Sequence, residues 1–174
     1  DGAFERTALT TVTIPSTVKL IGARAFKECT SLVAVTFVSN SMLERIGPEA
    51  FSKTALTAII MPSTVKTIDA YAFQDCSKLA TVTFPSSSVL ETISWQAFQS
   101  TALTSFTVPS TVNAIDYDAF KQCNSLTSFT VSCASTTTIH SSAFDSSGMT
   151  FLTLPSGVTY TGTISRTGIA SCSL

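Results

Sequence analysis

The stretch from Val112 to Val131 decides the fold, and it reads V-N-A-I-D-Y-D-A-F-K-Q-C-N-S-L-T-S-F-T-V. Versions of it recur along the chain, each with an Ala-Phe pair. The phenylalanines of these pairs are Phe4, Phe26, Phe51, Phe73, Phe98, Phe120 and Phe144, at intervals of 22, 25, 22, 25, 22 and 24 residues. A repeat of this length is typical of solenoids, in which one short unit stacks on copies of itself.

Two kinds of unit alternate, so the true period is 47 residues. The first kind continues as Phe-x-x-Thr-Ala-Leu, as at Phe51, and the second as Phe-x-x-Cys-x-x-Leu, as at Phe73. A strand-like run with alternating apolar residues follows each Leu, and a proline ends most of these runs because it cannot donate to a continuing ladder. A second apolar pair follows, such as Val112 and Ile115. Only stacking on neighbouring units buries all these groups.

The pattern predicts an α/β repeat solenoid that forms a single domain over residues 1–174, with about seven units of 22–25 residues. We expect the runs after each Leu to form a parallel sheet on one face. Short strands, turns and one- to two-turn helical segments at x-x-Ala-Phe-x-x-Cys should form the other face. The chain begins with Asp1-Gly2-Ala3-Phe4, which is the middle of a unit, so we expect it to be a fragment of a longer protein.

The segment I-P-S-T-V-K-L-I-G-A-R-A-F-K-E-C-T-S-L, from Ile14 to Leu32, and its copies resemble the BspA-like class of leucine-rich repeats over nearly the whole chain. The resemblance implies a right-handed leucine-rich-repeat superhelix. Proteins of that family, from bacteria and mucosal protist parasites, are mostly surface or secreted proteins linked to adhesion. The chain departs from the motif at Val38 and Ser132, where the proline is missing, and in the weaker unit after Cys133.

Composition excludes several classes of partner. Only 12% of the residues are charged and the net charge is -1, so nothing attracts nucleic acid or an anionic membrane surface. The apolar runs are the length of strands, and none is long enough to span a bilayer. We therefore expect no nucleic-acid partner and no membrane insertion by this chain.

The cysteines predict buried thiols. Cys29, Cys76, Cys123 and Cys172 share one position of the repeat. Residues two units apart in a stack lie roughly 9 to 10 Å apart, beyond the limit of about 7 Å for a disulfide. A column of thiols also gives no converging metal ligands. Cys133 lies outside the column and is the candidate for a reactive thiol.

No catalytic residues, cofactor or metal site are predicted. His140 is the single histidine, and no strand-turn-helix elbow surrounds a nearby serine, so we interpret it as a solvated loop residue. Asp69 and Asp116 lie 47 residues apart, which indicates a repeated surface turn residue and not a carboxylate pair.

Two sets of residues are candidates for partner binding. Thr83, Thr107 and Thr130 share an outward strand position, which is typical of exposed strands but also offers a ligand-facing surface. Trp95 and Tyr117, with Tyr71, precede their Ala-Phe pairs and should lie near the outer edge. They could anchor a partner or simply pack between units.

The sequence thus favours a protein-binding module that is not an enzyme, in a cell-surface or secreted adhesin. Its expected partners are proteins of host cells or matrix, or a second copy of the chain. The alternative is an intracellular, cytoplasmic scaffold, favoured by the unpaired cysteines and by the lack of an Asn-x-Ser/Thr sequon.

Overall fold

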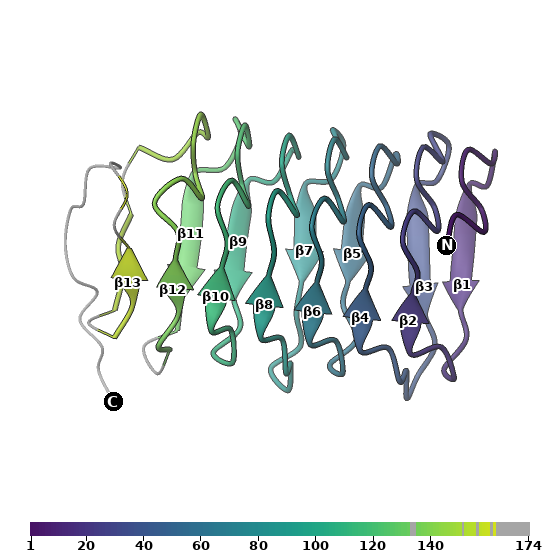
Figure 1. Ribbon diagram of the computed structural model, residues 1–174, viewed down its shortest axis with the longest axis horizontal. Coiled ribbons are helices and arrows are strands. Elements are labelled where there is room, and N and C mark those ends of the chain that lie inside the picture. The colour runs from purple at the N-terminus through teal and green to yellow at the C-terminus, as the bar shows by residue number, and fades with distance from the viewer. Residues whose placement is uncertain (133–134, 151, 156, 161, 163–174) are drawn as a thin grey trace.

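A computed structural model of the chain describes residues 1–132, 135–150, 152–155, 157–160 and 162. They form a β-solenoid in which long and short parallel strands alternate (Figure 1). The long strands are β1 (Thr11–Ile14), β3 (Ala34–Phe37), β5 (Ala58–Ile60), β7 (Thr81–Thr83), β9 (Ser105–Val108) and β11 (Ser128–Val131). The short strands are β2 (Leu20–Ile21), β4 (Arg45–Ile46), β6 (Thr67–Ile68), β8 (Thr92–Ile93), β10 (Ala114–Ile115), β12 (Thr138–Ile139) and β13 (Thr159–Tyr160).

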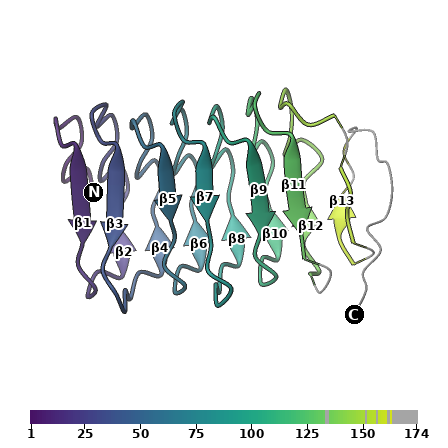
Figure 2. The same ribbon diagram turned by 180° about the vertical axis from the view of Figure 1, so that it is seen from behind.

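The repeat solenoid with parallel strands is confirmed, but the continuous sheet lies on the face where it was not expected. The short strands form one seven-stranded sheet in the order β13-β12-β10-β8-β6-β4-β2. The long strands form three separate pairs, β1 with β3, β5 with β7 and β9 with β11, and Figure 2 shows this grouping. Each pair joins a unit of the first kind to one of the second. The pairing therefore follows the 47-residue period of the sequence.

The ladder stops after each unit of the second kind, where the connection between the long and the short strand is longer. From Phe37 to Ile46 the chain advances nine residues, whereas from Ile14 to Ile21 it advances seven. The breaks in the ladder, between β3 and β5 and between β7 and β9, follow these longer connections.

The predicted helical segments were wrong: no residue that the structure describes is in a helix. Two residues that flank Phe26, Arg24 and Glu28, have φ of 58° and 59°, in the left-handed region that a right-handed helix excludes. The N–H of Phe26 donates to the Ala50 carbonyl at 2.8 Å, and that of Glu28 to Ser52 at 2.8 Å. These N–H groups therefore join adjacent units, whereas a helix would pair them with the carbonyl four residues earlier.

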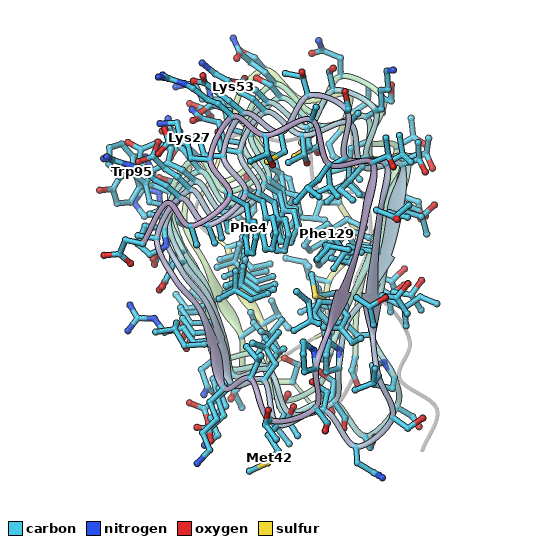
Figure 3. The ribbon with its side chains drawn as sticks, turned by 90° about the vertical axis from the view of Figure 1, so that its right-hand side faces the viewer. Phe4, Lys27, Met42, Lys53, Trp95 and Phe129 are labelled. Carbon is cyan, nitrogen blue, oxygen red and sulfur yellow. The ribbon has the colours of Figure 1, made fainter. Side chains whose placement is uncertain are left out.

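Columns of aromatic side chains fill the core. The seven phenylalanines of the Ala-Phe pairs stack at centroid distances of 5.2 to 5.8 Å. Figure 3 shows this column along the solenoid axis, with Phe4 labelled in it. Phe106 and Phe129 continue the core toward the long strands and meet Phe120 edge to face. Except for Phe4 at the first unit, each ring is buried by its neighbours in adjacent units, so the interfaces between units hold the fold together.

Candidate functional site

Four rings form a continuous row on the outer edge of the solenoid, and we call Tyr71, Trp95, Tyr117 and His140 the aromatic row. Trp95 lies 4.7 Å from Tyr71 and 5.3 Å from Tyr117 between ring centroids. Tyr117 meets His140 edge to face at 5.4 Å. Tyr117 is 44% exposed, His140 is exposed, and the other two rings are half-buried. Figure 3 places Trp95 at this edge.

The sequence located three of these rings and missed the fourth. Trp95 and Tyr117 lie three residues before their Phe, Tyr71 lies two before and His140 four before. The turns between the short strands and the Ala-Phe pairs absorb this difference and bring the rings into line. His140 is exposed as predicted, but its ring belongs to the row. The signal that could have identified His140 is that it lies in the same turn as Tyr117 does in the preceding unit.

Amide and charged side chains surround the aromatic row. The Gln96 side chain donates to Asp118 at 3.3 Å, and Lys121 donates to the same carboxylate at 3.0 Å. Gln74 donates to Gln99 at 3.3 Å, across one interface between units. Burial raises the pKa of Tyr71, with smaller contributions from Tyr117 and Glu49.

Ion pairs cover the same edge in the preceding units. Arg6 contacts Glu28 at 2.7 Å, and Glu49 accepts hydrogen bonds from both Lys27 and Arg24. The hydrogen bond from Lys27 is the main cause of the lowered pKa of Glu49. The outer edge therefore carries ion pairs in the first units, and aromatic and amide side chains join them further along the solenoid.

The three candidate threonines lie on the long strands and do not join the aromatic row. Thr107 and Thr130 are exposed register partners on β9 and β11. Thr83 is exposed on β7, where its register partner is Ile60. The break between β7 and β9 separates Thr83 from the other two. In Figure 3 the long strands and Trp95 lie on opposite sides of the cross-section, so the two sets of candidates form separate surfaces.

The cysteine column has the predicted character in the described residues, where Cys29, Cys76 and Cys123 are buried free thiols. The Cys76 thiol donates to the Phe51 carbonyl at 3.0 Å and lies 3.2 Å from the Thr54 hydroxyl. Burial raises the pKa of Cys76 to about 11, which keeps the thiol protonated and unreactive. The candidate reactive thiol, Cys133, and Cys172 lie outside the described residues.

Among the described residues, polar groups with catalytic or metal-binding potential do not cluster. Asp69 is buried and accepts a hydrogen bond from Arg45 at 2.6 Å, so interpreting it as a surface turn residue was wrong. His140 contacts the Ser142 hydroxyl at 3.1 Å. Across the part of the chain that the structure describes, no group of three potential metal ligands occurs. No described helix is long and apolar enough to cross a membrane.

The chain is similar to several bacterial proteins of known structure. The pneumococcal vaccine antigen PcpA is 33% identical over 69% of this chain and 29% of its own, with a TM-score of 0.63. A leucine-rich repeat protein from Bacteroides ovatus is 25% identical over 87% and 44%, with a TM-score of 0.68. A leucine-rich cell surface protein from Faecalibacterium prausnitzii is 31% identical over 75% and 42%, with a TM-score of 0.53.

The chain spans less than half the length of each of these three proteins. No curated protein matches it. The family model of the BspA type leucine rich repeat region matches it in six copies, over residues 1–127 and 44–173. These matches cover the units whose stacking is described above, and the chain therefore belongs to the BspA-type leucine-rich repeat family.

Proposed function

We propose that this chain is a protein-binding module, without enzymatic activity, of a cell-surface or secreted adhesin, and that the aromatic row is its main contact surface. The observation that carries the proposal is the alignment of Tyr71, Trp95, Tyr117 and His140 on one outer edge. Tyrosine and tryptophan supply much of the energy of protein interfaces because they combine a large apolar area with a polar tip.

Two further features support the proposal, one for the aromatic row and one for the location. The Trp95 indole nitrogen is buried without a hydrogen-bond partner among the described residues. A carbonyl group of a partner would satisfy this donor after a small shift of the neighbouring rings. The similarity to a vaccine antigen and to a cell surface protein supports a location at the cell surface. The partners we propose are proteins of host cells or of the extracellular matrix.

The exposed threonines form a second, weaker candidate surface. Thr107 and Thr130 offer paired hydroxyl groups on β9 and β11, and Thr83 lies beyond the break in the ladder. Hydroxyl groups without an apolar anchor contribute little to an interface, since threonine is uncommon among the residues that dominate binding energy. We therefore assign these threonines a supporting role at most.

Binding of the full protein to host cells and immobilised matrix proteins tests the proposal. We expect Tyr117→Ser to weaken binding by about tenfold or more, because a central interfacial tyrosine contributes roughly 2 kcal/mol. Val89→Ser is the matched control, since Val89 is 40% exposed. Val89 lies one 47-residue period after Met42, which Figure 3 labels at the opposite end of the cross-section from Trp95.

Equal binding by both variants would contradict the role of the aromatic row. Labelling of intact source cells with a membrane-impermeant reagent tests the location separately. Labelling from outside is the expected result. Labelling only after permeabilisation would contradict the adhesin proposal and support an intracellular scaffold.

A further inference from the structure

An open groove of about 780 Å³ lies on the long-strand face, between β3 and β5, where the ladder stops. Its wall on the β3 side includes Thr36, Val38 and Asn40, and its wall on the β5 side includes Ile60 and Ser63. None of the residues that line it carries a charge. The groove therefore combines apolar side chains and neutral polar groups along the line where β3 and β5 share no ladder.

Ile60 departs from the residue type that the other long strands have at its position, and the fold does not require this departure. Its side chain is 71% exposed, the highest value among the large apolar side chains of the described residues. The other five long strands have threonine at this position, namely Thr13, Thr36, Thr83, Thr107 and Thr130. Because the same fold forms with threonine in five units, packing does not explain the isoleucine.

The break between β7 and β9 serves as an internal comparison, because it lies one period of 47 residues further along the chain. There Thr107 takes the place of Ile60, and Pro85 takes the place of Val38, which is 37% exposed. The two breaks have the same topology and differ in surface chemistry. The first break therefore exposes isoleucine and valine side chains where the second has a threonine and a proline, and this difference is not a consequence of the broken ladder.

We propose that the groove between β3 and β5 binds an extended, uncharged peptide segment of a partner protein, with an apolar side chain against Ile60 and Val38. A charged segment would lose hydration without gaining an opposite charge, since the lining is neutral. Asn40 and Ser63 offer donors and acceptors for the peptide backbone, and a peptide that follows the strands can use alternate side chains for specificity. The inference rests on the proposed protein-binding function and adds a site with a defined partner chemistry.

Titration with synthetic peptides, followed by NMR of ¹³C-labelled isoleucine methyl groups, tests this proposal. The probes are the neutral peptide acetyl-Ser-Val-Phe-Val-Ser-amide and its charged counterpart acetyl-Ser-Glu-Phe-Lys-Ser-amide. We expect the neutral peptide to shift the Ile59 and Ile60 signals saturably, with a Kd on the order of 1 mM or below. The charged peptide should bind at least about fivefold more weakly.

Two substitutions taken from the chain itself complete the design. Ile60→Thr should weaken the neutral peptide at least about fivefold without loss of folding, because five sister strands have threonine there. Thr107→Ile is the matched control and should leave binding at the first groove unchanged. The Ile59 methyl group and the peptide signals report binding in the Ile60→Thr variant.

The proposal is overturned if neither peptide shifts Ile59 or Ile60, or if both variants bind equally well. It is also overturned if Ile60 shifts with protein concentration alone, since a second copy would then occupy the groove. A Tyr117→Ser variant separates the two proposals, because it should retain peptide binding. If the protein binds matrix through Tyr117 and the groove binds no peptide, only the groove proposal fails.

Discussion

Replacement of Phe98 by alanine should be the most destructive single change in the core. Phe98 is fully buried and stacks on Phe73 at 5.3 Å and on Phe120 at 5.5 Å. It also packs against Phe106 at 5.3 Å. The substitution therefore opens a cavity at two interfaces between units at once.

The size of the effect follows from these contacts. Truncation of a buried phenylalanine to alanine lowers the free energy of unfolding by about 3 to 5 kcal/mol. Because Phe98→Ala removes three ring contacts, we expect a loss near the upper end of that range. Phe4→Ala is the matched control, because Phe4 is 45% exposed and stacks on Phe26 alone among the described rings. We expect a loss of only about 1 to 2 kcal/mol there.

Equilibrium unfolding in urea measures both values. Trp95 is the single tryptophan and lies three residues before Phe98, so its fluorescence reports on the units concerned. Circular dichroism should give the same midpoint if the solenoid unfolds as one unit. A difference between the two variants below about 1 kcal/mol would refute the reasoning that stacked interfaces hold the fold together.

Three further predictions concern the turns and the titratable groups. Cys76 should react with Ellman's reagent at pH 8 only after unfolding, because burial raises its pKa to about 11. The stability that this thiol contributes is complete below its ordinary pKa of 9.0 and declines as the pH rises from 9.0 to 11. Fast labelling of the native protein would contradict its burial. Because the pKa of Glu49 is lowered, its ionised carboxylate stabilises the fold above the ordinary pKa of 4.5, and this stabilisation is lost as the pH falls below that value. Glu49→Gln should therefore flatten the acid side of a stability profile measured by thermal unfolding. An unchanged profile would show that the Lys27 contact is unimportant. Ser146 has a left-handed φ of 55°. Ser146→Gly should therefore raise the free energy of unfolding by about 0.5 to 1 kcal/mol, and Ser146→Val should lower it. If urea titrations show the valine variant to be more stable than the glycine variant, residue 146 is not left-handed.

The intervals between the Ala-Phe pairs were sufficient to predict stacked parallel strands, since each unit could bury its apolar residues only against a copy of itself. They also predicted a column of buried thiols. The pattern could not distinguish a helical turn from the observed turns, because both place Ala and Phe inward. Left-handed conformations at residues such as Arg24 and Glu28 decide between them. Gly2 has the position of Arg24 in the first unit, with φ of 61°, but the other units have no glycine there to signal the conformation.

The candidate site was predicted in part. Trp95, Tyr117 and Tyr71 were identified, but their positions relative to Phe differ by one residue, so the sequence alone did not predict a single row. His140 was interpreted as a solvated loop residue because no strand-turn-helix elbow surrounds a nearby serine, and that argument did not compare it with the aromatic residues of the preceding units. Ile60 was not among the predicted site residues, since nothing in the sequence indicated that the ladder would break beside it.

The sequence by itself determined the repeat, its 47-residue period and the residues that fill the core, because burial depends on composition and spacing. Only the tertiary structure decided which strands share a ladder, since the hydrogen bonds of a ladder join residues of different units. It also decided that Tyr71, Trp95, Tyr117 and His140 meet, and that Ile60 lies beside a groove. These contacts join residues of different units, and they exist only after the units have stacked.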